Sequence, residues 1–314
     1  MKLLNLLLLS AACCGAAAQA ADSYPTKSIE LVVSYQPGGG SDSTARAIAD
    51  AARPLMPQSV VVLNRPGASG SIGWSYVAGS DDGYRLILMT PEMLVVPLMG
   101  IGKVTVGDFQ PIARFTDDPS SITVRADAPW RTAQEFIQYA KANPGKVTFS
   151  NAGNGTIPHV AAGAFAETIG AQLEHIPYNG SAPAIMGLLA GDVQATTVAY
   201  AELRQYVESG KLRTLAVMSE KRVAGLDAPT LKELGHDLQF SVWRGLGLPR
   251  NAPREAVEKW RAVSRELATS PKFQETMTKQ NLTPSYADTP AFIADIERQN
   301  QAVKTLMPKL NLKQ

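Results

Sequence analysis

The sequence has little cysteine and little histidine, and this scarcity excludes several kinds of chemistry. Its only two cysteines, Cys13 and Cys14, both lie in the first twenty residues. If the chain is cut after Ala20, as argued below, no cysteine remains, which excludes disulfides, thiolate metal sites and a cysteine nucleophile together. The three histidines stand far apart in the chain, and no pair has metal-ligand spacing. We therefore expect neither a metal nor a cofactor.

The common catalytic and nucleic-acid-binding motifs are missing as well. The stretch from Gly67 to Ser71 lacks the final glycine of a serine-hydrolase elbow, and no glycine-rich turn carries the lysine of a P-loop. Lys plus Arg is 30 against 28 Asp plus Glu, with no basic block, so nucleic acid is not an expected partner. We expect a protein that is not an enzyme.

The N-terminus has the pattern of an export signal. Lys2 is followed by an apolar run from Leu3 to Leu9 and then by Ala18-Gln19-Ala20, a small-x-small cleavage pattern. We expect residues 1–20 to be a signal peptide, cleaved near Ala20, and the mature protein to be periplasmic. Lipidation at Cys13 is a minor alternative, because Ser10 stands where a lipoprotein signal has an aliphatic residue.

The rest of the chain alternates strands and helices. Its 314 residues are enough for two packed domains. Apolar runs at 29–33, 59–63 and 85–89 each precede a turn and a helical pattern, which predicts a largely parallel sheet. Similar units follow at 147–169 and 173–189, and further strands are predicted at 109–115, 121–124, 193–199, 212–217 and 240–248. The tail is predicted to be helical at 254–268, 271–280 and 290–303.

Two glycine-rich turns, one in each predicted domain, are the strongest candidates for a ligand site. The first, Tyr35 to Asp42, contains three consecutive glycines, and Ser41 or Asp42 is expected to cap the helix after it. The second is Asn151 to Thr156, with Thr156 as the expected cap. Free N–H groups and a positive dipole end suit an anion, so the pair could clamp one between them without a buried arginine.

Eight short motifs carry a resemblance to a known family. They are Tyr24-Pro25-x-Lys27, Pro37-Gly38-Gly39-Gly40-x-Asp42, Asn64-Arg65-Pro66-Gly67-Ala68-x-Gly70, Asp82-Gly83-Tyr84, Gly153-Asn154-Gly155-Thr156-x-x-His159, Pro177-Tyr178-x-Gly180-x-Ala182-Pro183-Ala184, Gly210-Lys211-Leu212-Arg213 and Trp243-x-Gly245-Leu246. In this order, over essentially the whole mature chain, they resemble the substrate-binding proteins of tripartite tricarboxylate transporters, the Bug family.

The resemblance implies an α/β, two-lobed periplasmic binding protein fold of type II-like topology, with the ligand in an interdomain cleft. We expect residues 21–124 with 241–314 to form lobe 1 and residues 125–240 to form lobe 2. The implied function is to capture a small carboxylate and deliver it, as a monomer, to membrane permease subunits. The ligand-binding residues that we carry over from the family or place in its loops are Tyr35, Gln36, Gly39, Gly40, Ser41, Asp42, Thr90, Asn151, Ala152, Gly153, Thr156, His159, Tyr178 and Val198.

Several of these positions have two interpretations. Tyr35 could offer a hydroxyl or only an aromatic wall, His159 could face the ligand or pack its helix, and Tyr178 could line the cleft or lie beneath it. Glu92 is expected to be a helix-start acid rather than a cleft residue. Many relatives carry an acid near Val198, and its absence here weakly favours an aromatic or di-acid ligand over an amino acid.

Two other functions stay open at this point. A liganded binding protein could dock to a membrane sensor kinase instead of a permease. A less favoured hypothesis is an exported hydrolase or a structural surface protein.

Overall fold

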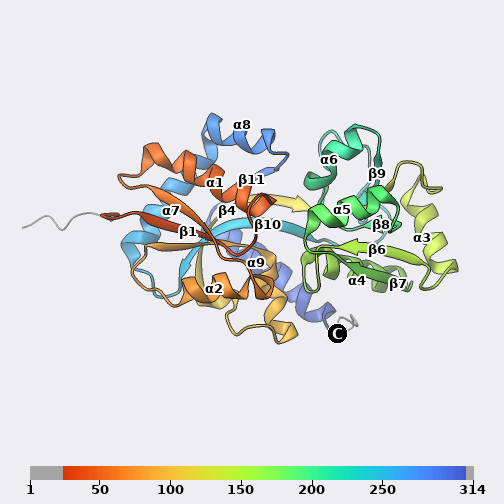
Figure 1. Ribbon diagram of the computed structural model, residues 1–314, viewed down its shortest axis with the longest axis horizontal. Coiled ribbons are helices and arrows are strands. Elements are labelled where there is room, and N and C mark those ends of the chain that lie inside the picture. Colours follow the sequence, from red (N-terminus) through yellow and green to blue (C-terminus); the bar gives the residue numbers. More distant parts are fainter. Residues whose placement is uncertain (1–23, 309–314) are drawn as a thin grey trace, which may run out of the picture.

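The computed structural model describes residues 24–308 and contains two β-sheets, each forming the centre of one lobe (Figure 1). The first sheet has the strand order β11-β4-β10-β3-β1-β2, and the second has the order β7-β6-β8-β5-β9. The two-lobed α/β fold expected from the sequence is confirmed. Across residues 24–308, no helix combines the length and the apolar character needed to cross a membrane. The signal-peptide prediction falls outside the described residues.

The first sheet begins with three parallel strands, as the repeated strand-turn-helix pattern predicted. β1 (Ile29–Val33) pairs in parallel with β2 (Val60–Asn64) and β3 (Arg85–Met89). Both faces of β1 are covered, because its side chains alternate between two clusters of buried residues. Helix α1 (Gly40–Ala52) packs on one face and α2 (Ser71–Ala78) on the other. Short 3-10 turns connect these elements: η1 (Arg53–Leu55), η2 (Ala68–Gly70), η3 (Pro91–Leu94), η4 (Val96–Met99) and η5 (Val106–Asp108).

The remaining strands of this sheet are antiparallel. β4 (Phe109–Pro119) lies between β10 (Ser241–Pro249) and β11 (Pro284–Ala287), and β11 was not predicted from the sequence. The C-terminal helices complete the lobe: α7 (Arg254–Thr269), α8 (Pro271–Lys279) and α9 (Thr289–Leu306). α7 and α8 pack on the α1 face of the sheet, whereas the first half of α9 packs on the α2 face.

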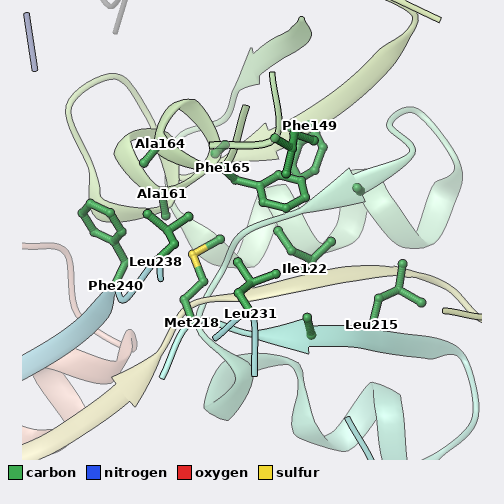
Figure 2. Close-up of a cluster of buried hydrophobic side chains, with 14 of the residues drawn as sticks. Ile122, Phe149, Ala161, Ala164, Phe165, Leu215, Met218, Leu231, Leu238 and Phe240 are labelled. Carbon is green, nitrogen blue, oxygen red and sulfur yellow. The ribbon is translucent and has the colours of Figure 1, made fainter. Parts of the chain in front are cut away.

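The second sheet contains β5 (Ser121–Arg125), β6 (Val147–Asn151), β7 (Leu173–Pro177), β8 (Ala195–Thr196) and β9 (Leu212–Val217). Its helices are α3 (Ala133–Ala142), α4 (Ile157–Ile169), α5 (Ser181–Ala190) and α6 (Tyr200–Glu208). α3 and α4 cover one face through a single buried cluster that includes Phe149, Phe165, Met218 and Phe240 (Figure 2). α5 and α6 cover the other face.

The chain crosses between the lobes at Ser120 and again at Phe240. Ser120 donates from its backbone N–H to the carbonyl of Phe240 at 2.9 Å, and Met218 donates to Ser120 at 2.8 Å. The expected lobe boundary after Val124 is therefore four residues too late, because all of β5 pairs with β8 and β9 in the second sheet. In Figure 1, β4 and β10 run side by side toward this crossing.

Helix α9 is a third connection between the lobes. Its Phe292 and Ile296 belong to the buried cluster under the first sheet. Val303, two turns further on, is fully buried in the cluster of the second lobe, with Leu306 and Met307 packed against the same cluster. The stretch from Phe292 to Met307 therefore contributes to both cores.

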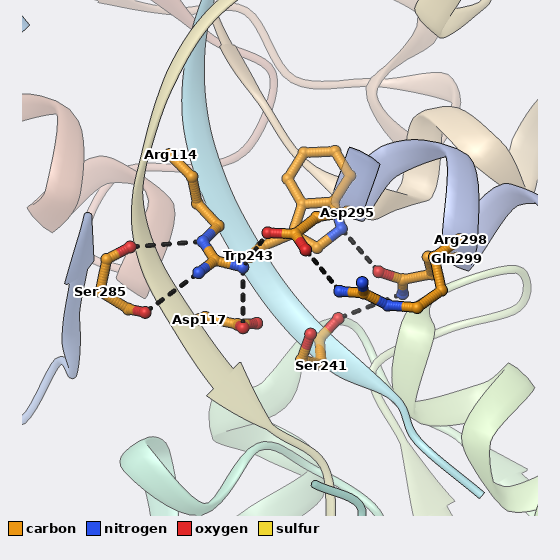
Figure 3. A network of polar contacts seen from close by, with 8 residues as sticks. All are labelled: Arg114, Asp117, Ser241, Trp243, Ser285, Asp295, Arg298 and Gln299. Carbon is orange, nitrogen blue, oxygen red and sulfur yellow. Dashed lines mark hydrogen bonds and ion pairs between the residues drawn. The ribbon is translucent and has the colours of Figure 1, made fainter. Parts of the chain in front are cut away.

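A polar network holds α9 onto the strands that lead to the crossing (Figure 3). Arg114 on β4 donates to Asp117 at 2.9 Å and to Asp295 of α9 at 2.6 Å. The indole N–H of Trp243 on β10 donates to the side-chain oxygen of Gln299 at 2.6 Å. Because these groups are mostly buried and paired, they fix the position of α9 relative to β4 and β10.

Candidate functional site: the facing loops and a buried charge cluster

The first glycine turn leaves the start of α1 without a side-chain cap. Gly39 is the N-cap residue, in an extended conformation (φ −86°, ψ 174°), and no side chain accepts from the first N–H groups. This differs from the expected cap by Ser41 or Asp42. Gln36 and Gly39 are exposed and Ser41 is half-buried, so the turn presents its backbone at the surface.

Asp42 is turned away from this surface and holds the turn in shape. Its carboxylate accepts from the N–H of Gly38 at 3.0 Å, from Arg46 at 3.0 Å and from Asn64 at 3.0 Å. Although burial opposes ionisation, these hydrogen bonds lower the pKa of Asp42 below its ordinary value. With its oxygens occupied, Asp42 holds the loop in its conformation.

Tyr35 and Thr90 are brought together, with Glu92 as their third member. The Tyr35 hydroxyl lies 2.8 Å from Thr90 Oγ1 and donates to Glu92 Oε2 at 3.2 Å. Glu92 stands in the first turn of η3, as expected, but it is also buried against the first loop. Burial and the nearby Glu92 carboxylate raise the pKa of Tyr35 well above its ordinary value, so this hydroxyl keeps its proton.

Arg244 lies directly behind the first loop and was missed in the sequence. Its guanidinium packs against Gly40, where a Cβ would come within 2.5 Å of Nη2, so only glycine allows this approach. Nη1 pairs with Asp118 at 2.6 Å, and Nη2 lies 3.6 Å from Oε1 of Glu202 in the other lobe. A single charged residue inside the apolar run 240–248 was the available signal.

The second glycine turn is built around Asn151 and Thr156. Asn151 is fully buried; its Oδ1 accepts from the N–H of Gly153 at 2.9 Å, whereas its Nδ2 has no partner among residues 24–308. Thr156 is the N-cap of α4, but its hydroxyl donates to the Gly153 carbonyl at 2.7 Å. The half-buried Ala152 completes the turn. Asn151 therefore carries a buried donor that no residue among 24–308 satisfies.

Each glycine turn lies at a contact with the opposite lobe. Behind the first turn, Arg244 approaches Glu202 of α6. At the second turn, Gly155 packs against Met99 of η4, since a Cβ at Gly155 would lie 2.5 Å from Met99 Sδ. Both glycine turns therefore lie at the contact between the lobes, on opposite sides of it.

His159 stabilises the second turn through a hydrogen bond. Its Nδ1 accepts from the N–H of Gly155 at 3.1 Å, and its ring meets that of His175 at a centroid distance of 5.1 Å. Burial, with a smaller effect of the nearby His175 ring, lowers the pKa of His159 to about 4. His159 is therefore neutral at pH 7 and acts as a hydrogen-bond acceptor for the loop.

The remaining two residues carried over from the family, Tyr178 and Val198, pack their side chains inside lobe 2. Tyr178 packs its hydroxyl end against α5, where a Cβ at Gly187 would lie 2.3 Å from the phenol oxygen. Val198 is fully buried in the apolar cluster under α5 and α6, as a β-branched side chain next to a sheet commonly is. One helical turn further on, Glu202 stands in the first turn of α6.

Protonation of His159 should reduce stability in acid. Because its folded pKa lies below the ordinary value of 6.5, the unfolded chain binds more protons between pH 6.5 and 4. The part of the free energy of unfolding that depends on neutral His159 is at most about 3 kcal/mol. It is fully present above pH 6.5 and is lost as the pH falls toward 4. We expect His159→Gln to flatten the decline in melting temperature between pH 7 and 4.5. His236→Gln, outside this pair, should leave it unchanged; equal slopes for the two variants would contradict this role.

Comparison with known proteins agrees with this architecture. The family model described as "Tripartite tricarboxylate transporter family receptor" matches residues 44–312. The chain belongs to this family. BugT of Bordetella pertussis is 32% identical over 306 residues, covering 94% of each chain. A crystal structure of a TctC solute binding protein from Polaromonas is 43% identical, with a TM-score of 0.80 over 92% of this chain and 100% of that chain.

A third similar protein was solved with a ligand in place. It is R. palustris Rpa4515 with adipate, 26% identical to this chain, with a TM-score of 0.78 over 90% of this chain and 97% of that chain. Membership of the tripartite tricarboxylate transporter family makes this chain a solute-binding protein. Within residues 24–308, no group of three or more His, Cys, Asp or Glu residues is arranged to hold a metal ion.

Proposed function

We propose that this protein captures a small carboxylate between its two lobes in the periplasm and delivers it, as a monomer, to the permease of a tripartite tricarboxylate transporter. The observation that carries the proposal is the uncapped start of α1 in front of the buried Arg244 guanidinium. Two positive features that converge on one exposed glycine turn favour an anion there.

The second turn supports the same function. The unpartnered Nδ2 of Asn151 is a buried donor at the carboxyl end of β6, and buried donors normally have an acceptor. A carboxylate oxygen would supply one, with the backbone of Gly153 beside it. Rpa4515, solved with adipate, is a similar protein with a carboxylate ligand.

A ligand screen tests the proposal directly. Protein purified from the periplasm should show a higher melting temperature with at least one carboxylate from a panel of mono-, di- and tricarboxylates and acidic amino acids. At a hundred times its dissociation constant, a ligand of the folded state adds about 2.7 kcal/mol, or roughly 5 °C for a chain of this size. The matching amides are the control. No shift with any carboxylate, or equal shifts with the amides, would argue against the function.

A further inference from the structure

Arg244 is a buried cation whose hydrogen-bonding capacity is only partly used. Its side chain is 3% exposed, and a guanidinium has five N–H donors. One of them reaches Asp118 at 2.6 Å, whereas Nε has no partner among residues 24–308. The approach of Nη2 to Glu202, at 3.6 Å, is too long for a hydrogen bond. An arginine this deeply buried normally has its donors satisfied, so a partner is missing.

The unsatisfied side of Arg244 lies next to the start of α1. The Gly40 Cβ position is 2.5 Å from Nη2 and 3.4 Å from Nε, so the glycine turn is in direct contact with both nitrogens. Asp118 occupies Nη1 and is itself held by the N–H of Thr283 at 3.1 Å. Asp118 therefore neutralises the Nη1 end of the guanidinium, whereas Nη2 has no carboxylate within hydrogen-bond distance among residues 24–308.

Glu202 is the acid that reaches this place from the opposite lobe. It lies in the first turn of α6. Burial raises the pKa of Glu202; the Arg244 guanidinium and the Ser181 side chain oppose the rise, and the carboxylates of Asp118 and Glu92 reinforce it. A carboxylate is thus held near Arg244 by residues of lobe 2 but does not form a hydrogen bond with it.

We propose that Arg244 anchors one carboxylate of the ligand and that Glu202 is a built-in competitor, which a ligand carboxylate displaces from the guanidinium. The inference rests on the proposed function and names the side chains that set its affinity. The ligand carboxylate takes the place of Glu202 at Nη2, and the unpartnered Nε beside it offers the second donor of a bidentate pair. Because the carboxylates of Asp118 and Glu202 already lie at the guanidinium, the site favours ligands with one or two carboxylates over tricarboxylates, through like-charge repulsion.

Removing the competitor should strengthen binding. In Glu202→Gln the side chain keeps its size and hydrogen-bonding atoms but loses its charge. We expect the dissociation constant for adipate and glutarate, measured by calorimetry at pH 7.5, to fall at least tenfold. Glu208→Gln, on the exposed end of the same helix, is the matched control and should bind as the wild type does. A gain in affinity cannot arise from a damaged fold, so it separates this role from a structural one.

Arg244→Lys provides the second test, because lysine keeps the charge beside Asp118 but cannot form the bidentate pair. We expect its dissociation constant to rise at least tenfold while the melting temperature stays close to that of the wild type. If the wild type binds a dicarboxylate and Glu202→Gln binds it equally or more weakly, the inference is overturned and the proposed function stands. If neither the wild type nor Glu202→Gln binds any carboxylate of the panel, both are overturned.

Discussion

Gly39→Val is expected to weaken carboxylate binding at least a hundredfold while leaving both lobes folded. Gly39 adopts φ −86° and ψ 174°, a conformation open to valine, and an added Cβ would meet no atom within 4 Å. The side chain would stand beside the free N–H groups of α1 and keep a ligand oxygen from reaching them. Each lost charge-assisted hydrogen bond is worth about 1.5–3 kcal/mol, so two of them account for the hundredfold loss.

Gly39 is a sharper site for this test than Gly40, where a Cβ would also displace Arg244. The matched control is Gly79→Val, at the exposed end of α2, where an added Cβ makes only an ordinary contact of 3.5 Å with the Ser75 carbonyl. Calorimetry gives the affinity, and the melting temperature confirms the fold. Unchanged affinity in a folded Gly39→Val protein would show that the α1 turn does not hold the ligand.

Asp118→Ala is expected to destabilise the protein by about 3–5 kcal/mol, because it leaves the Arg244 charge buried without its close partner. Asp118 is fully buried and also accepts from Thr283, so its loss removes a link to the segment before β11. A shift of the urea unfolding midpoint measures the effect. Asp118→Ala combined with Arg244→Met should recover much of the loss, since the buried charge is then gone.

The neighbouring Asp117 provides the control. It points to the other side of β4, its side chain is 30% exposed, and its partner Arg114 keeps a second carboxylate in Asp295 (Figure 3). We expect Asp117→Ala to shift the midpoint by well under half as much. Equal losses for the two variants would mean that the Arg244–Asp118 pair contributes no more than an ordinary partly exposed pair.

Elements with strong local signals were predictable from the sequence. The strand Arg85–Met89 has the expected bounds, and α3 begins where the Thr132–Glu135 capping box indicates. β11 was missed because Pro284–Ala287 has no apolar alternation and becomes a strand only by pairing with β4. The strand expected at 193–199 shrinks to Ala195–Thr196, since the chain leaves the sheet to begin α6. The existence of β11 and the short length of β8 depend on contacts between segments that are distant in the sequence.

The candidate site was likewise predictable only where it depends on local sequence patterns. The glycine turns follow from short local patterns, so their positions at strand ends were predictable. The environment of Arg244 could not be predicted, because Gly40, Asp118 and Glu202 reach it from three distant parts of the chain. Local spacing also could not show that Asp42 and Val198 turn into their own lobes.

The helix α9, which contributes to both cores, limits how the lobes can separate. Rotation about the β4 and β10 crossing alone would pull Val303 out of the second lobe, where it is fully buried. Exposing a valine of this kind costs on the order of 1.5–3 kcal/mol, which alone would hold the open population to roughly a tenth to a hundredth of the closed one. A ligand that enters only the open form then binds with an apparent affinity reduced by the same fraction. By disfavouring the open form, helix α9 would raise the ligand concentration that is needed for half-saturation.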